Sequence, residues 1–386
     1  MKKIGIITIV KVNNYGAELQ AFALQKKLEL MGYHAEIIDY LYYKNWRFKD
    51  TKESQPFIPM SRKEKLTYWT KYRLINFLID RILPIINNAV RNRNNRFDSF
   101  HKVNTKFSKT FFSYQELYHT KFDYDIFIVG SDQVWNPAAS STIEPYFLTF
   151  APKDAKKISY ASSFGVSQIE DQLKEKYRTL LNNINIISVR EDSGIKLVKQ
   201  LTGKDATLVA DPTLLLSKQE WTNYMKLYPN MPPRYILIYQ LSDSDAIVNL
   251  AYRISSERNI PIFRICKRAF NVRKDRGINN ILDAGPSEFL SLFYNAEYII
   301  TNSFHGTAFS VNFNKPFFTM VSSTKKNNAR MQSLLELMNL KDRLIYDNID
   351  VKAIDISTQK LDFQNCNIKL EKIQKDSITF LANSVF

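Results

Sequence analysis

The chain has 386 residues, 45% of them hydrophobic and 24% charged, a composition typical of a globular protein of about two domains. Its ten glycines are too widely spaced for a G-x-G-x-x-G dinucleotide fingerprint, a P-loop or a G-x-S-x-G nucleophile elbow. Four histidines and two cysteines lie far apart, which argues against a metal site and favours a cytoplasmic protein.

Short apolar runs alternate with helical patterns over residues 1–228, which predicts an α/β domain built on buried parallel strands. The run at 4–9 is expected to be a strand, 17–31 a helix and 35–39 the next strand, which together form a βαβ unit. Polar residues that follow such strands gather at one edge of the sheet, where ligands bind. The further strands predicted here lie at 125–129, 157–161, 184–189 and 207–209.

Residues 44–109 form a basic and aromatic helical insert in this domain, with sixteen lysines and arginines against five acidic residues. Such a segment is suited to contact with an anionic membrane surface. A helix whose apolar stripe is core and whose lysines are solvated also explains the pattern. Nucleic acid is disfavoured as a partner because no recognition motif accompanies the charge.

Three prolines within residues 229–233 predict a stiff linker, after which a second α/β domain is expected over 234–350. Residues 351–386 form a C-terminal tail, whose helix at 368–386 is expected to pack back on the first domain. The strands predicted in the second domain lie at 235–240, 261–265, 298–301 and 316–321, and the helices at 244–257 and 287–295.

The motif NNYGAELQ at residues 13–20 turns from the first strand into a helix. Asn14, Tyr15 and Gly16 therefore lie where backbone N–H groups can hold a ligand. A plain βα loop with asparagine as the helix cap explains the same residues.

The motif GSDQVWN at residues 130–136 follows the buried strand at 125–129. Asp132 can act there as a general base toward a sugar hydroxyl, with Trp135 as a stacking platform for the ring. Ser131 and Gln133 would line the same acceptor-binding edge. As a helix cap, however, Asp132 would need no catalytic function, and the sequence leaves both interpretations open.

Two motifs carry candidate donor-binding residues. In SVREDSG at residues 188–194, Arg190 can form a bidentate contact with a carboxylate or phosphate, or pair with a neighbouring acidic residue. The later ADPT motif at 210–213 is more typical of a structural turn. In TNSFHGTA at 301–308, His305 is expected at a helix N-terminus, where Gly306 allows close backbone approach.

In their order and spacing, NYGAxLQ, GSDQVWN, SVRExSG, ADPT and SFHGT resemble the motifs of the polysaccharide pyruvyl transferase family over about residues 5–344. The resemblance implies two Rossmann-like α/β domains facing a cleft, similar to the GT-B glycosyltransferase fold, with the acceptor on the N-terminal side and the donor on the C-terminal side. It also implies phosphoenolpyruvate as donor, a sugar of a surface polysaccharide or its lipid-linked oligosaccharide precursor as acceptor, and a pyruvate ketal as product. Such an enzyme would act in exopolysaccharide or capsule biosynthesis of the cell envelope.

By this resemblance, Arg190 matches the family arginine that meets the donor, and His305 matches the histidine of the donor site. Many members have an arginine two places before that histidine, where this chain has Ser303. We therefore expect a substitute cation from the segment after the strand at 316–321, with Arg330 and Lys326 as candidates. A basic surface loop is the alternative interpretation of that segment.

Ketal formation requires an acid, a base and a cationic anchor, for which His305, Asp132 and Arg190 are the candidates. The scheme requires no metal and no organic cofactor. A GT-B type glycosyltransferase that uses a nucleotide sugar in polysaccharide biosynthesis is the alternative function, and a non-catalytic basic protein is a third. A lipid-linked acceptor would make the enzyme a peripheral protein at the inner face of the cell membrane.

Overall fold

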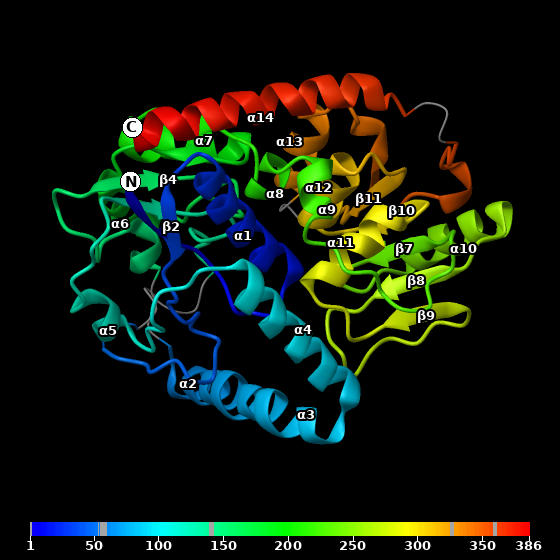
Figure 1. The fold of residues 1–386 in the computed structure, drawn as a ribbon, viewed down its shortest axis with the longest axis horizontal. Coiled ribbons are helices and arrows are strands. Elements are labelled where there is room, and N and C mark those ends of the chain that lie inside the picture. Colours follow the sequence, from blue (N-terminus) through cyan, green and yellow to red (C-terminus); the bar gives the residue numbers. More distant parts are fainter. Residues whose placement is uncertain (1, 53, 55–59, 139–142, 325–327, 358–360) are drawn as a thin grey trace. The chain divides into compact units, whose positions relative to one another are not determined.

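The computed structural model describes residues 2–52, 54, 60–138, 143–324, 328–357 and 361–386. Contacts divide the chain into two compact units, whose elements are labelled in Figure 1. Unit 1 comprises Met1–Asn87, His101–Leu215 and Asp376–Phe386, and unit 2 comprises Asn88–Phe100 and Leu216–Lys375.

Unit 1 contains a parallel sheet of the strand order β2-β1-β3-β4. Isolated parallel bridges from β4 and the residues after it, at Ile158–Ile186 and Ser162–Val189, connect this sheet to the pair β5-β6. The chain thus reverses its direction of strand addition between β1 and β3, which is the switch point where α/β sheets bind ligands. The strands are β1 (Lys3–Ile7), β2 (His34–Ile37), β3 (Ile126–Val129), β4 (Lys156–Ser159), β5 (Ser188–Val189) and β6 (Thr207–Leu208).

The helices of unit 1 follow the predicted alternation. Helix α1 connects β1 to β2 and is buried over most of its length, because the sheet and other helices cover it on several sides. Besides α2 and α3 of the basic insert, described below, the helices that lie in this unit are α1 (Tyr15–Leu30), α5 (Tyr114–Tyr118), α6 (Asp171–Asn182), α7 (Asp192–Thr202) and α8 (Pro212–Leu215).

Unit 2 contains a six-stranded, all-parallel sheet of the order β12-β11-β10-β7-β8-β9. This is the strand order of a Rossmann fold, and its switch point lies between β7 and β10. The strands are β7 (Ile236–Tyr239), β8 (Ile262–Ile265), β9 (Ile278–Ile281), β10 (Tyr298–Thr301), β11 (Phe317–Val321) and β12 (Leu344–Tyr346). The helices that lie wholly in this unit are α9 (Lys218–Thr222), α10 (Asp245–Arg258), α11 (Pro286–Asn295), α12 (Phe304–Asn312) and α13 (Ala329–Leu337). The predicted fold class, with two Rossmann-like α/β units, is therefore confirmed.

The compact units divide the chain earlier than the proline-rich linker that the sequence predicts at 229–233. Residues after Leu216 already pack in unit 2, where the Trp221 ring meets Phe309 at 5.3 Å. The Tyr228 hydroxyl donates to Asp283 at 2.6 Å in the same unit. The C-terminal helix α14 (Phe363–Val385) starts before the predicted 368, and its last residues belong to unit 1.

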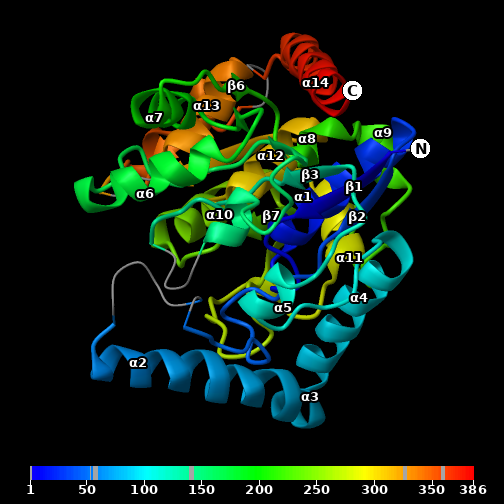
Figure 2. The same cartoon turned by 90° about the vertical axis from the view of Figure 1, so that its left-hand side faces the viewer.

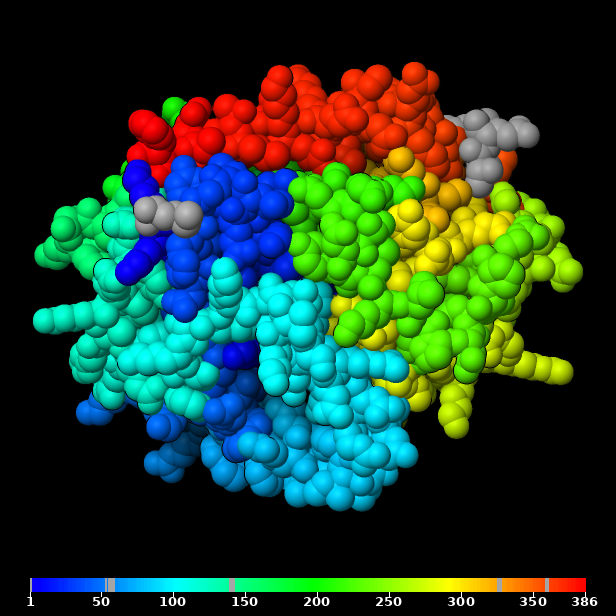
Figure 3. Space-filling model, in the orientation of Figure 1, coloured from blue at the N-terminus to red at the C-terminus, as the bar shows by residue number. Residues whose placement is uncertain are grey.

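The basic insert divides into two parts with different environments. Helix α4 (Asn88–Asn104) buries Val90, Arg93, Phe97 and Phe100, as the core interpretation expects. The preceding segment runs through α2 (Arg62–Trp69), η1 (Thr70–Ile75), η2 (Leu78–Ile82) and α3 (Leu83–Ile86) with no buried residue in any of these elements. It forms one extended helical stretch (Figure 2), and its side chains lie at the surface in the space-filling view (Figure 3).

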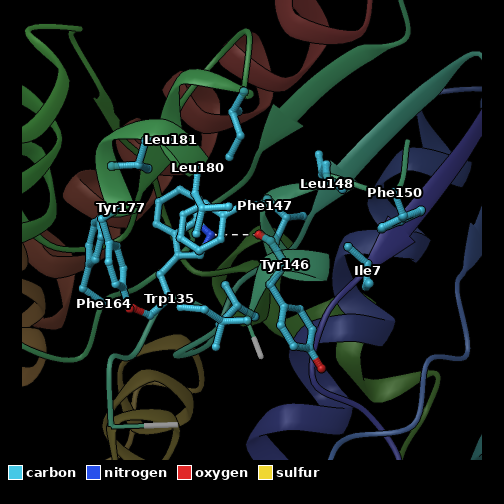
Figure 4. Close-up of a cluster of buried hydrophobic side chains, with 14 of the residues drawn as sticks. Ile7, Trp135, Tyr146, Phe147, Leu148, Phe150, Phe164, Tyr177, Leu180 and Leu181 are labelled. Atoms are coloured by element: carbon cyan, nitrogen blue, oxygen red, sulfur yellow. Dashed lines mark hydrogen bonds between the residues drawn. The ribbon is translucent and has the colours of Figure 1, made fainter. Parts of the chain in front are cut away.

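A cluster of aromatic side chains forms part of the core of unit 1 (Figure 4). The Trp135 ring stacks on Phe147 at 5.2 Å and 11° and meets Phe164 at 5.1 Å, while its Nε1–H donates to the carbonyl of Tyr146. Its exposed fraction is 0%. The prediction that Trp135 stacks on a sugar is therefore wrong, because the ring is enclosed by core side chains.

We expect Trp135→Ala to lower the free energy of unfolding by roughly 3 to 5 kcal/mol, the usual cost of truncating a buried aromatic side chain. Urea denaturation measures this quantity. Trp69→Ala is the matched control, because Trp69 is 54% exposed and should change stability by no more than about 0.5 kcal/mol. Similar losses in both variants would contradict the burial of Trp135.

Candidate functional site

The switch point of unit 2 brings together the residues that follow β7 and β10. The Thr301 hydroxyl donates to the carbonyl of Tyr239 at 2.6 Å and accepts from the Ser303 N–H at 3.0 Å. Asn302 connects the two loops, because it accepts from the Leu241 N–H at 2.7 Å and its Nδ2 donates to the Ser242 carbonyl at 2.8 Å. Asn302 was not among the predicted site residues, although its place between a predicted strand and the histidine was a usable signal.

Ser303 is the N-cap of α12 and is 1% exposed. Its hydroxyl accepts from the Gly306 N–H at 3.3 Å, and its carbonyl accepts from the N–H of Thr307 at 2.9 Å. A serine at this position thus has a structural function as a cap. The same geometry accounts for Gly306, since a Cβ there would lie 2.3 Å from Thr301 Oγ1. The close approach that Gly306 allows is to Thr301 of the same unit.

His305 lies in the first turn of α12 and is 8% exposed. Its ring meets Phe304 edge to face at 5.2 Å. Unpaired backbone N–H groups and the helix dipole make a helix N-terminus favourable for an anion. The prediction that His305 sits at a strand-to-helix turn is confirmed, and its position at the switch point makes it the leading candidate of this unit.

Gln240 follows β7 and adds a polar group that the sequence analysis did not single out. It is 6% exposed, and its Nε2 lies 3.3 Å from Asp243 Oδ1. Among the described residues, no hydrogen-bond partner is found for its buried Oε1. An unpaired buried carbonyl is costly, so this edge of the sheet has capacity to accept a hydrogen bond from a ligand.

Of the two expected substitute cations, Arg330 lies in the first turn of α13, and α13 packs against α12. The side chain of Arg330 is partly buried. Lys326 lies outside the described residues. The elements that carry Arg330 and His305 are thus neighbours in unit 2, while donor contact by either cation remains a prediction.

In unit 1, the candidate residues after β3 and β5 converge on one buried guanidinium. Arg190 is 0% exposed in its side chain, and its Nη1 lies 2.8 Å from Asp211 Oδ2 and 3.2 Å from Ser131 Oγ. Its Nη2 lies 3.4 Å from Asp132 Oδ1, and its Nε lies 3.7 Å from Glu191 Oε2. Arg190 therefore pairs with acidic side chains of the same chain, Asp211 above all and Glu191 beside it.

Burial lowers the pKa of Arg190, but the Asp211, Asp132 and Glu191 carboxylates outweigh it and the net pKa is raised. The Ser131 hydroxyl also donates to Asp211 at 2.8 Å. The ADPT motif thus supplies the main counter-ion of Arg190, a function that the sequence analysis, which interpreted the motif as a turn, did not predict.

Asp132 is the most exposed member of this cluster, with 18% of its side chain accessible. Its φ of 76° lies in the left-handed region, which is unfavourable for a residue other than glycine. Its Oδ1 accepts from the Gln133 N–H at 2.8 Å. Backbone strain of this kind is often found at functional positions, so Asp132 remains the best candidate base of this unit.

The remaining acceptor candidates have structural contacts. Gln133 Oε1 accepts from Asn136 Nδ2 at 2.6 Å. Asn14 caps α1 by accepting from the Gly16 N–H at 3.0 Å, as the cap interpretation expects. Tyr15 is 1% exposed and its side chain belongs to the core, and contact of the Tyr15 backbone with an acceptor stays a prediction.

In the part of the chain that the structure describes, no group of three or more His, Cys, Asp or Glu side chains is arranged to hold a metal ion.

A family model described as polysaccharide pyruvyl transferase matches residues 14–324, more than half of the chain. The chain belongs to the polysaccharide pyruvyl transferase family. The matched region contains all five motifs that suggested the resemblance, so that prediction is confirmed. Membership of the polysaccharide pyruvyl transferase family supports a transferase activity. A search of curated proteins found no match.

Several solved structures are similar to this pyruvyl transferase family member. UGT89C1 of Arabidopsis thaliana complexed with UDP-L-rhamnose has 9% identity and a TM-score of 0.49, covering 98% of this chain and 94% of its own. The UDP-GlcNAc 2-epimerase of Neisseria meningitidis bound to UDP-GlcNAc has 8% identity and a TM-score of 0.46, with coverages of 100% and 99%. MurG of Acinetobacter baumannii has 8% identity and a TM-score of 0.43, with coverages of 99% and 98%. All three TM-scores are below 0.5, so the fold is assigned from the strand order of the chain itself.

We expect Asp211→Asn to lower the free energy of unfolding by roughly 3 to 5 kcal/mol, because Arg190 would keep a buried charge without its main counter-ion. Glu297→Gln removes the partner of the exposed Arg234 and is the control, with a much smaller effect. The double variant Asp211→Asn/Arg190→Met should recover part of the loss. Chemical denaturation measures all three, and equal effects at Asp211 and Glu297 would contradict this account.

Proposed function

We propose that this family member transfers pyruvate from phosphoenolpyruvate to a sugar and forms a pyruvate ketal. The observation that carries the proposal is the placement of His305 at the N-terminus of α12, at the switch point between β7 and β10. A helix N-terminus suits a phosphate or carboxylate, and a histidine beside it can transfer a proton.

In the proposed reaction, C3 of the donor gains a proton and one acceptor hydroxyl adds to C2. The bond from C2 to the phosphate oxygen then breaks, and a second hydroxyl of the acceptor takes its place. One hydroxyl proton ends on the new methyl group and the other on the released phosphate, so atoms and charge balance. The protonated His305 is the proposed acid for C3.

Asp132 is the proposed base for an acceptor hydroxyl, since its carboxylate is the accessible one of its cluster. Arg190 acts through Asp132 in this proposal, because its guanidinium lies 3.4 Å from Asp132 Oδ1 and can orient that carboxylate. The donor contact that the resemblance implies for Arg190 stays a prediction, since its side chain is 0% exposed and its Nη1 is paired with Asp211.

The family supports a polysaccharide or sugar acceptor. We propose that this acceptor is a lipid-linked oligosaccharide of exopolysaccharide or capsule biosynthesis, used at the inner face of the cell membrane. Among the described residues, no helix is both long and apolar enough to span a bilayer.

The direct test is to incubate the protein with phosphoenolpyruvate and candidate lipid-linked oligosaccharides and to measure phosphate release together with the mass of the ketal.

We expect His305→Ala to remain folded but to lower turnover by about 10² or more, the usual contribution of a general acid. His119→Ala is the control, because this histidine is exposed and belongs to unit 1. Wild-type turnover in folded His305→Ala would refute the assignment. Release of a nucleotide from a nucleotide sugar, without ketal formation, would instead identify a glycosyltransferase.

We expect Arg330→Ala to weaken donor use by roughly 1.5 to 3 kcal/mol in kcat/KM, the value of a hydrogen bond to a charged group. Phosphoenolpyruvate carries two anionic groups, and Ser303 supplies no charge to neutralise them. Arg268→Ala is the control, since it removes an exposed arginine from the same unit. Unchanged kcat/KM for phosphoenolpyruvate in both Arg330→Ala and Lys326→Ala would refute the idea that one of these cations replaces the arginine found in many family members at the position of Ser303.

A further inference from the structure

The helical segment 62–86 has its apolar side chains at the surface. Of nineteen exposed large hydrophobic residues in the described part of the chain, nine lie in this segment, so the exposure is concentrated there. Their exposed fractions range from 38% at Phe77 to 77% at Ile86. The nine residues are Leu66, Trp69, Leu74, Ile75, Phe77, Leu78, Ile82, Ile85 and Ile86.

Five of these side chains are spaced by four residues or a multiple of four. Residues four apart lie on one side of an α-helix, and the slightly larger turn of a π-helix keeps the same relation. The spacing therefore places an apolar stripe along the segment, which consists of α2, η1, η2 and α3, with Thr70 between Leu66 and Leu74. The members of this stripe are Leu66, Leu74, Leu78, Ile82 and Ile86.

The side of the segment that faces the rest of unit 1 makes polar and aromatic contacts instead. Arg73 Nη1 donates to the carbonyls of Tyr43 and Asn45 at 2.9 and 3.0 Å, and Arg73 Nη2 pairs with Asp50 at 2.7 Å. The Tyr68 ring stacks on Tyr43 at 6.3 Å. This is the reverse of a usual surface helix, which turns its apolar stripe to the core and its polar side to water.

The charge of the segment specifies the kind of partner. Residues 62–86 contain six basic and two acidic side chains. Lys63 and Lys65 are exposed beside Leu66 at the start of the stripe, and Trp69 is more than half exposed. A helix that lies in the headgroup region of an anionic bilayer typically has these features: an apolar stripe, lysines and an aromatic ring at the interface.

We propose that the segment 62–86 is a membrane-contact surface, whose apolar stripe inserts into an anionic lipid bilayer while its lysines meet the headgroups. This proposal deepens the proposed function, because a membrane-bound enzyme would meet a lipid-linked acceptor at the bilayer surface. Only this link to the acceptor rests on the proposed function. The contacts of Arg73 and Tyr68 with Tyr43 in the same unit leave the stripe available without any rearrangement.

The test is co-sedimentation of the full chain with vesicles of phosphatidylglycerol and phosphatidylcholine, or of phosphatidylcholine alone. We expect at least about tenfold stronger partitioning to the anionic vesicles, weakened at high salt. Leu74→Asp/Leu78→Asp should reduce binding at least about tenfold, because two charges would enter the apolar layer. Leu227→Asp/Ile368→Asp is the matched control, with two exposed aliphatic residues outside the segment replaced in the same way.

A second pair of variants tests the charge. Lys63→Glu/Lys65→Glu should reduce binding to anionic vesicles about tenfold or more, whereas Lys372→Glu/Lys375→Glu, which reverses two exposed lysines of α14, should change it much less. Unaltered circular dichroism and thermal midpoints are expected in all four variants, because the replaced side chains are exposed.

Three results would overturn the proposal. The first two are equal binding to neutral and anionic vesicles, and an equal loss of vesicle binding in the stripe and control variants. The third is a dimer, detected by light scattering and dissociated by Leu74→Asp/Leu78→Asp, which would identify a second copy of the chain as the partner. Vesicle binding needs no donor and no turnover. A chain that binds anionic vesicles through the stripe but makes no ketal would therefore refute the proposed function and leave this surface intact.

Discussion

The parallel register of β7 and β10 is the constraint on which the candidate site of unit 2 depends. The pairing ends with Thr301 opposite Tyr239, so both strands reach the sheet edge at the same level. The Thr301 hydroxyl can then bridge the Tyr239 carbonyl and the Ser303 N–H. Helix α12 begins from this junction, and the place of His305 follows from it. A slip of one residue would turn the side chains of β10 to the opposite face and remove the bridge.

A second constraint, in unit 1, is electrostatic. A guanidinium without solvent contact is stable only where carboxylates and hydroxyls satisfy it, and Asp211, Ser131 and Glu191 do so for Arg190. The cluster connects the ends of β3, β5 and β6, which are distant in sequence. It also positions the carboxylate of Asp132, whose left-handed backbone would otherwise be hard to maintain.

The sequence predicts those parts of the fold that depend on hydrophobic patterning. Buried runs such as IFIV of β3 and YIIT of β10 are recognisable because both faces of a parallel strand are covered. The edge strands β9 and β12 were missed: β9 reads INNI, with two asparagines, and β12 has three residues. Short edge strands carry too little pattern to be distinguished from loops.

For the candidate site, local motifs predict which residues follow the strands but not which way they face. GSDQVWN places Asp132 correctly at a sheet edge, yet it gives no sign that Trp135 turns inward to Phe147. The ion pair between Arg190 and Asp211 joins residues of two motifs that are twenty-one positions apart in the chain, so it depends on tertiary packing. The sequence also left two interpretations of the insert open, membrane contact or a core stripe, and the pattern alone does not determine that the apolar side chains of 62–86 are exposed.

The four tryptophans are divided between the buried cores and the basic insert, two in each, so their fluorescence should differ between these environments. Trp135 and Trp221 are fully buried, one in the core of unit 1 and the other in that of unit 2. Trp46 and Trp69 lie in the basic insert, where the Trp46 ring meets Phe77 at 5.2 Å. The buried pair should emit at short wavelength and resist aqueous quenchers, whereas the insert pair should emit to the red. The intrinsic fluorescence of the chain can thus distinguish its buried cores from its basic insert.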